Sequence, residues 1–475
     1  MQVDTKVWTN KINEIIKNKN QKYIVLTMGC QLNENDSEKI AGMLKEAGFE
    51  KTDKIEEASI IVFNTCCVRE NAEERLLGKL GEVKKYKEEK GTIIAIGGCM
   101  MQEKNMLNKI KESYKYVDIL FGPHTIENFP KDVYEALVEK KKIEDIIDVD
   151  GDIFEGLPTE RNDKIKASIS IMNGCNNFCT YCIVPYVRGR ERSRNPQDII
   201  DEAVKVASEG YKEITLLGQN VNSYLVSEKQ KNNDLMYEVN INGSIKKVNS
   251  FATLLMALNE VNGIERIRFI SPHPKDFTDD VIEAINKCEK VCKLIHLPLQ
   301  SGSSEVLKKM NRKYTKEQYL SLVEKIKNKI PNVKFSTDII VGFPGETEED
   351  FNDTLDVVSK VRYEQVFMFI YSRRVGTVAD KMENQIDEKV KHERFDRLKK
   401  LYEEICEENN KKYIGNKEYI LVEGCSKTNE NMLTGRTYSN KVVNFEGPKN
   451  LIGNIVKVKI ISEHMWYLKG KYDTI

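Results

Sequence analysis

Apolar segments recur along the chain at regular intervals, and polar stretches with helical periodicity separate them. The first three are residues 23–28, 59–64 and 92–97, and residues 35–48 between the first two repeat with the spacing of a helix. Alternating strands and helices of this kind predict a parallel sheet covered by helices. We therefore expect an N-terminal parallel-sheet α/β domain over residues 21–138.

Six further apolar or β-branched segments follow a charged stretch, residues 139–164, that we interpret as a linker. Helical patterns separate these segments, which are residues 168–173, 214–219, 267–271, 294–300, 336–343 and 365–372. Six strand–helix units are fewer than the eight of a closed parallel barrel, so they predict an open, partial (β/α)6 barrel over residues 165–395. Residues 225–250 are polar and predict a surface excursion, with a hairpin at 240–243.

The end of the chain changes from a helical to a strand pattern. Residues 386–412 are strongly helical, and strand-like and turn-like stretches alternate afterwards. We expect a small C-terminal β-barrel over residues 411–475. This part has eleven Lys and Arg against six Asp and Glu, although the whole chain has 74 of each. A basic β module that contains Arg436 and Phe445 is suited to binding RNA.

Composition sets the class of protein and its compartment. At 475 residues, with 40% hydrophobic residues and only 11 Pro, the chain is a multidomain globular protein and not a collagen or a disordered chain. No apolar run reaches the roughly 18 residues of a membrane helix, and the start lacks the apolar core of a secretory signal. We expect a cytoplasmic protein without membrane association, in which the 11 cysteines stay reduced.

Three cysteines lie close together just after the first strand of the expected barrel. Cys175, Cys179 and Cys182 form a C-x3-C-x2-C run. Three thiolates on one loop can hold three irons of a 4Fe-4S cube and leave the fourth iron open for a substrate. The alternative is a structural zinc site, which needs a fourth ligand, and none of the five histidines is adjacent in sequence.

Three other cysteines end the three strands of the N-terminal domain. Cys30, Cys66 and Cys99 follow these strands, and the ends of parallel strands meet at one edge of a sheet, where α/β folds place their sites. The alternative is that they are free cysteines packed under the sheet. Cys67 is next to Cys66, but consecutive strand residues point to opposite faces, so we do not expect both to be ligands.

The cysteine loop resembles that of the radical S-adenosylmethionine (SAM) superfamily, and the upstream trio is similar to that of the methylthiotransferases. The resemblance covers residues 21–475, includes a TRAM-like terminal module, and implies a second 4Fe-4S cluster on Cys30, Cys66 and Cys99. Cys66 is preferred to Cys67 because the family pattern places the ligand directly after Asn-Thr. The resemblance also implies that the open iron of the cluster on Cys175, Cys179 and Cys182 binds SAM, whose cleavage releases a 5′-deoxyadenosyl radical.

Further segments repeat the family pattern and suggest contacts with SAM or RNA. They are LGQNVNSY at 217–224, LPLQSGSSEVLKKMNRKYT at 297–315 and DIIVGFPGETEEDF at 338–351. Arginines of RGRERSR at 188–194 either face solvent or clamp a cofactor carboxylate or an RNA phosphate. YSRRVGTVA at 371–379 lacks the family's usual prolines. The expected cofactor-binding residues are Tyr181, Gln219, Gln300, Gly342, Gly345 and Glu346, and the expected RNA-binding residues are Arg188, Arg190, Arg436 and Phe445.

The motifs NTCCVRENAEER at 64–75, LGQNVNSY and HPKDF at 273–277 are most similar to the MiaB-type branch of the family. That branch inserts sulfur at carbon 2 of N6-(dimethylallyl)adenosine beside the tRNA anticodon and methylates it with a second SAM. The resemblance implies tRNA, an external electron donor and a sulfur source as partners, and we expect a monomer. The alternatives are the branch that acts on tRNA threonylcarbamoyladenosine and a non-catalytic iron–sulfur RNA-binding sensor.

Overall fold

The computed structural model describes residues 5–67, 72–147, 153–226, 236–427 and 429–472. It divides into two compact units. The first unit contains Met1–Asp163 together with Met172–Asn176 and Cys182–Arg194, and the second contains the rest of the chain. Parts of the NTCCVRENAEER motif, the expected linker and the polar excursion lie outside the described residues.

The first unit is built on a parallel sheet with the strand order β2-β1-β3-β4-β5-β6. The three expected strands are confirmed as β1, β3 and β4. The short edge strand β6 lies within residues 139–164, which we expected to form a linker. Its residues pair with β5 despite their polar composition. The bounds are β1 Lys22–Met28, β2 Glu50–Lys51, β3 Ile60–Thr65, β4 Ile93–Gly98, β5 Ile119–Phe121 and β6 Ile143–Asp145.

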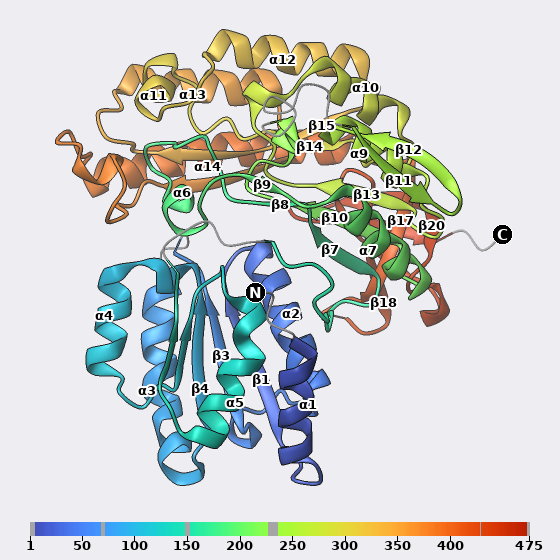
Figure 1. Cartoon of the computed structure of the whole chain (residues 1–475). Helices are drawn as coiled ribbons and strands as arrows, with labels where there is room; N and C mark the ends of the chain where they lie inside the picture. Colours follow the sequence, from blue (N-terminus) through green and yellow to red (C-terminus); the bar gives the residue numbers. More distant parts are fainter. Residues whose placement is uncertain (1–4, 68–71, 148–152, 227–235, 428, 473–475) are drawn as a thin grey trace. The chain divides into compact units, whose positions relative to one another are not determined.

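Helices cover both faces of this sheet (Figure 1). Ile12 of α1 and Ile40 of α2 pack with Phe129 of α5 on one face, and Leu76 of α3 packs with Ile110 of α4 on the other. Each such buried side chain contributes about 1.5–3 kcal/mol, so the two apolar layers fix the sheet between them. The bounds are α1 Thr5–Ile16, α2 Gln31–Glu46, α3 Ala72–Lys90, α4 Lys104–Ser113 and α5 Phe129–Tyr134.

The second unit contains the six parallel strands that the sequence predicts. They form two three-stranded groups, ordered β13-β10-β7 and β14-β15-β16, and a bridge between Ile267 and Val291 joins the groups. Among the described strands, β7 and β16 do not pair, so the barrel is open. The bounds are β7 Lys166–Ser170, β10 Glu213–Leu217, β13 Arg266–Phe269, β14 Leu294–His296, β15 Lys334–Val341 and β16 Gln365–Ile370.

Helices with strong caps alternate with these strands. The side chains of Thr315 and Thr347 form capping boxes that start α12 and α13. The expected hairpin is confirmed as β11 Tyr237–Ile241 and β12 Ser244–Val248, joined by Asn242 and Gly243 with positive φ. The helices are α7 Pro196–Ser208, α9 Phe251–Asn259, α10 Asp279–Lys287, α11 Ser304–Lys309, α12 Lys316–Lys329 and α13 Glu348–Val361.

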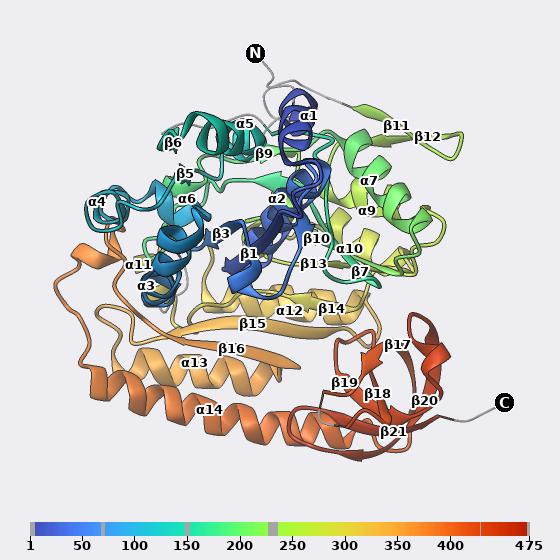
Figure 2. The same cartoon turned by 90° about the horizontal axis from the view of Figure 1, so that it is seen from below.

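The long helix α14, Glu388–Lys411, leads into a closed five-stranded barrel in the same unit (Figure 2). The strand order is β17-β18-β19-β21-β20, which confirms the expected small β module. Its bounds are β17 Lys417–Cys425, β18 Met432–Arg436, β19 Val442–Glu446, β20 Ile455–Glu463 and β21 Leu468–Tyr472. In the part of the chain that the structure describes, no helix is long and apolar enough to span a membrane.

Candidate iron–sulfur and SAM site

Cys30, Cys66 and Cys99 lie at the carboxyl ends of three adjacent strands of the first unit. Met28 of β1 pairs with Thr65 of β3, and Thr65 pairs with Gly98 of β4. Cys66 and Cys99 come directly after two of these paired positions, and Cys30 follows Met28 by two residues. The strand register therefore gathers the three cysteines at one edge of the sheet.

The surroundings of Cys30 and Cys99 favour thiolates, the form that binds metal. A hydrogen bond from Cys66, together with the nearby charge of Arg188, lowers the pKa of Cys30 to about 5 against the opposing effect of burial. Cys30 also lies at the N-terminus of α2, where the helix dipole favours negative charge.

Cys67 takes part in the same group of sulfurs. Its thiol donates to Cys99, which raises the pKa of Cys67 and lowers that of Cys99. Cys66 therefore contacts Cys30, whereas its neighbour Cys67 contacts Cys99.

Within the described residues no three His, Cys, Asp or Glu side chains converge as the ligands of a single ion would. Each cysteine of a 4Fe-4S cube binds a different iron, so its ligands need not converge on one point. Because the pKa values of Cys30 and Cys99 are lowered and all three cysteines share one sheet edge, the donor set of Cys30, Cys66 and Cys99 fits such a cluster.

Buried polar side chains hold the start of α2 against the end of β3. Asn33 Nδ2 donates to Asn64 Oδ1 and to the carbonyl of Thr65, both at 3.2 Å. Asn64 Nδ2 donates in return to the carbonyl of Asn33 at 2.8 Å and to Ser37 Oγ at 2.9 Å. Sequence reasoning missed these residues, although a run of polar residues directly after a strand-end cysteine was the available signal.

Arg188 lies buried beside the same cysteines, with 4% of its surface exposed. Its Nε donates to Cys99 Sγ at 3.0 Å, and its Nη2 donates to Asp36 Oδ2 at 2.7 Å. A guanidinium held in this way has no surface to offer an RNA phosphate, so Arg188 leaves the expected RNA-binding set. Arg190, two residues later, is exposed.

The loop that carries Cys175, Cys179 and Cys182 is anchored through its backbone. Residues 172–176 and 182–194 pack with the first unit, where the amide of Cys175 donates to the carbonyl of Gly189. Residues 177–181 pack with the second unit, where Asn311 Nδ2 donates to the carbonyls of residues 177 and 178. In that unit Arg312 Nη1 also approaches Cys179 Sγ at 3.4 Å.

Tyr181 packs against an apolar cluster of the second unit that contains Phe343, Met310 and Tyr371. Phe343 belongs to the glycine-rich segment after β15, so the aromatic residue of the cysteine loop and this segment meet in one cluster. The YSRRVGTVA segment, which lacks the family's usual prolines, contacts the cysteine loop at its last residue, where the amide of Ala379 donates to the carbonyl of Thr180. The apolar side chains around Tyr181 are of the kind that suits contact with an adenine ring.

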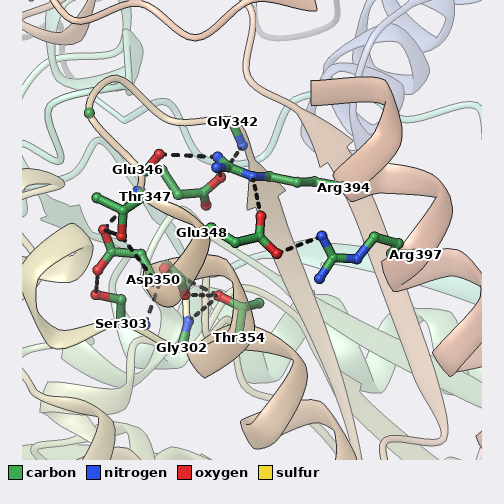
Figure 3. Close-up of polar contacts among 12 residues, drawn as sticks. Gly302, Ser303, Gly342, Glu346, Thr347, Glu348, Asp350, Thr354, Arg394 and Arg397 are labelled. Atoms are coloured by element: carbon green, nitrogen blue, oxygen red, sulfur yellow. Dashed lines mark hydrogen bonds and ion pairs between the residues drawn. The ribbon is translucent and has the colours of Figure 1, made fainter. Parts of the chain in front are cut away.

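The turn after β15 is fixed by buried charges (Figure 3). Glu346 Oε2 accepts from the amide of Gly342 and from Arg394 Nη1, both at 2.8 Å. Burial raises the pKa of Glu346 despite both partners. Gly342 and Gly345 have φ of 74° and 73°, and a Cβ on Gly342 would lie 2.3 Å from Lys391 Cγ. Glu346 therefore braces the turn from within, and the glycines allow its shape.

Gln219 and Gln300 follow two strands of the open barrel. Gln219 Oε1 is buried and has no hydrogen-bond partner within the described residues, so it can accept a bond from a ligand. Gln300 is held by its backbone, which donates to the carbonyl of Asp338 and accepts from Ile340, with φ at 69°. Gln219 is the stronger candidate for a ligand contact.

In the terminal barrel, Phe445 is fully buried in the core, because it alternates with the outward positions of β19. Its ring cannot stack on a base, so it also leaves the expected RNA-binding set.

Arg436 is partly exposed and pairs with Glu423 at 3.3 Å. Tyr419 is 51% exposed, and Lys457 Nζ lies 5.4 Å from the centre of its ring. Sequence reasoning missed this exposed pair on β17 and β20.

Comparison with protein-family models finds three matches along the chain. The Radical SAM superfamily matches residues 169–358, a family described as "Uncharacterized protein family UPF0004" matches residues 22–122, and the TRAM domain matches residues 411–472. The expected radical SAM and TRAM-like parts are thereby confirmed. Membership of the radical SAM superfamily implies a 4Fe-4S cluster and SAM.

Curated relatives match almost the whole chain. The tRNA-2-methylthio-N(6)-dimethylallyladenosine synthases of Clostridium botulinum (strain Eklund 17B) and Clostridium beijerinckii are each 52% identical over 97% of this chain and 98% of theirs. The synthase of Acetivibrio thermocellus is 50% identical over 97% of this chain and 93% of its own. Among solved structures, the radical SAM methyltransferase TsrM from Kitasatospora setae has a TM-score of 0.52 at 13% identity, covering 76% of this chain and 75% of its own. That likeness concerns the fold alone.

Proposed function

Because this chain belongs to the family of tRNA-2-methylthio-N(6)-dimethylallyladenosine synthases, we propose that it converts N6-(dimethylallyl)adenosine beside the tRNA anticodon into the 2-methylthio derivative. Carbon 2 of the adenine loses hydrogen and gains sulfur, and a methyl group from a second SAM completes the product. An external electron donor and a source of sulfur complete the set of reactants.

The observation that carries the proposal is the presence of two cysteine trios. Cys30, Cys66 and Cys99 end adjacent strands of the first unit, and Cys175, Cys179 and Cys182 share one loop. The second trio would hold the cluster that binds SAM and supplies the electron for its cleavage. The first trio would hold an auxiliary cluster associated with the sulfur that is transferred.

Residues around the loop would bind and orient SAM. Tyr181 is partly exposed and would receive the adenine ring, and the buried Phe343 of the same apolar cluster would support the Tyr181 ring. The turn from Gly342 to Glu346 brings backbone close to this apolar cluster, and the buried Arg394 holds the shape of the turn through Glu346. The buried acceptor Gln219 Oε1 is available for a donor group of SAM or of the substrate base.

The terminal barrel would hold the tRNA. Its strand β20 exposes Lys457 and Lys459, and Tyr419 of β17 lies opposite Lys457 in the register. Lysines neutralise backbone phosphates, and an exposed aromatic ring stacks on an unpaired base. Arg190 and Arg436 remain candidates for further phosphate contacts.

The test of the cluster assignment is an iron count after anaerobic reconstitution with iron and sulfide. We expect about eight irons per chain, and about four in the Cys175→Ala, Cys179→Ala, Cys182→Ala triple variant, since each cube holds four. We expect the same loss in Cys66→Ala, whereas Cys67→Ala serves as the matched neighbour and should keep about eight. A wild-type count of only about four would contradict the two-cluster proposal.

The test of the reaction is mass spectrometry of tRNA nucleosides after incubation with SAM and a reductant. The 2-methylthio derivative should form on tRNA carrying N6-(dimethylallyl)adenosine and not on tRNA carrying threonylcarbamoyladenosine, which separates the two branches of the family. Methylthio product from the Cys175→Ala variant would refute the assignment. An RNA-binding sensor would give no product with either tRNA while retaining both clusters.

A further inference from the structure

A buried arginine connects the loop after the SAM-binding cysteines with the auxiliary cysteines of the first unit. Arg188 donates from Nε to Cys99 Sγ at 3.0 Å and from Nη2 to Asp36 Oδ2 at 2.7 Å. Arg188 and Asp36 are both buried, and both lie in the first unit with Cys99. Water is therefore largely excluded from the ion pair and from the bond to sulfur.

A buried charge is costly unless its partners are fixed. Asp36 lies in the second turn of α2, the helix that directly follows Cys30, and it fixes the position of the guanidinium. Val187 and Ile183 from the same segment pack with Cys67 and Cys99 in one apolar cluster. The segment is therefore anchored both by packing and by charge, and the guanidinium remains directed at sulfur.

From this geometry we infer that Arg188 is a positioning residue that holds the Cys99 thiolate for the auxiliary cluster and raises the reduction potential of that cluster, with Asp36 holding the guanidinium in place. The inference rests on the proposed function, because it concerns the auxiliary cluster on Cys30, Cys66 and Cys99.

The physical basis is the charge of the cluster. Reduction adds negative charge to iron and sulfur, and a hydrogen bond or a nearby cation stabilises the reduced form more than the oxidised form. In a buried site this effect is only weakly screened by water. Removal of Arg188 should therefore make the auxiliary cluster harder to reduce.

The test uses the full chain with Cys175, Cys179 and Cys182 replaced by alanine, so that only the auxiliary cluster contributes to the signal. Arg188→Gln and Arg188→Met are added to this background, and Arg190→Met is the control, because it is the exposed arginine of the same segment. Iron content, circular dichroism, the midpoint potential from an anaerobic redox titration and the iron–cysteine bands in resonance Raman spectra are compared.

We expect a lower midpoint potential and shifted iron–cysteine bands in both Arg188 variants, with the larger change in Arg188→Met, because glutamine retains an N–H donor. The Arg190→Met control should keep the parent potential. A folded Arg188→Gln or Arg188→Met protein with about four irons and the parent potential overturns the inference.

Two further outcomes have distinct meanings. If the parent background holds no iron, the proposed auxiliary cluster itself is refuted. If the Gln and Met variants do not fold, Arg188→Lys keeps the charge opposite Asp36 but loses the forked geometry that serves two partners. That variant should show shifted iron–cysteine bands, and unchanged bands would overturn the inference.

Discussion

The guanidinium of Arg266 lies 4.3 Å from the centre of the Tyr438 ring, which joins the open barrel to the terminal β-barrel within one unit. Arg266 is fully buried, and its two Nη atoms donate to the carbonyls of Arg436 and Tyr419 at 2.7 and 2.8 Å. Arg266 of β13 thus holds strands β17 and β18 of the module that is proposed to bind RNA.

Replacement of Arg266 by alanine should destabilise this unit strongly. Two carbonyls lose a charged donor and the ring of Tyr438 loses its partner, so we expect a loss of about 3 kcal/mol in the free energy of unfolding. Chemical denaturation monitored by circular dichroism measures it. The control is Arg397→Ala, whose half-exposed ion pair with Glu348 should contribute less than about 1 kcal/mol. Equal losses in both variants would contradict the role of Arg266.

The buried carboxyl of Asp132 should make stability depend on pH. Burial, followed by the charge of Asp145, raises the pKa of Asp132 from 3.8 to about 8, and its Oδ2 has no hydrogen-bond partner within the described residues. The folded state therefore keeps a proton that the unfolded state releases above pH 4. Stability is lost as the pH rises from about 4 to about 8.

The measurement is the difference in unfolding free energy between the wild type and Asp132→Asn. Relative to the variant, the wild type should lose about 2–3 kcal/mol between pH 5 and pH 7, at about 1.4 kcal/mol per pH unit. Asp53→Asn, at an exposed position, should follow the wild type at every pH. A constant difference between wild type and Asp132→Asn across this range would show that the carboxyl does not titrate there.

Gly342→Ala should weaken the binding of SAM. The residue has φ of 74°, and an added Cβ would lie 2.3 Å from Lys391 Cγ, so the turn before Glu346 must shift. A strain of about 1–2 kcal/mol corresponds to roughly tenfold weaker binding in calorimetric titration, with the iron count unchanged. Gly78→Ala is the control, because among the described residues its added Cβ would meet no atom within 4 Å apart from its chain neighbours and the backbone of its own helix. Wild-type affinity in Gly342→Ala would mean that this turn does not contact SAM.

Tyr419→Ala and Lys457→Ala should each weaken tRNA binding. A stacked base contributes about 1–3 kcal/mol, so the loss of the Tyr419 ring should reduce affinity about tenfold. Removal of Lys457 should also reduce the salt dependence of binding by about one phosphate contact. Fluorescence anisotropy with labelled tRNA at several salt concentrations measures both. The exposed Lys449 is the charge-matched control. An equal loss of affinity in Lys449→Ala would mean that tRNA binding depends on the basic charge of the barrel in general and not on Lys457.

The sequence by itself determined the architecture of the chain. The three N-terminal strands, the six strands of the open barrel and the terminal β module follow from local periodicity, because a buried strand needs an apolar run and a helix needs one apolar face. The cysteine trios were also predictable, since Cys30, Cys66 and Cys99 each follow a parallel strand and parallel strands end at one edge.

Only the tertiary structure decided which side chains face the ligands and which face the interior. Arg188 belongs to a basic run that is typical of a solvated loop, yet the partners that bury it, Asp36 and Cys99, are 152 and 89 residues away. Phe445 and Tyr419 are both aromatic residues in strands, but closure of the barrel places one ring inside and the other outside. Local sequence sets the periodicity of an element, whereas burial and charge pairing depend on the distant segments packed against it.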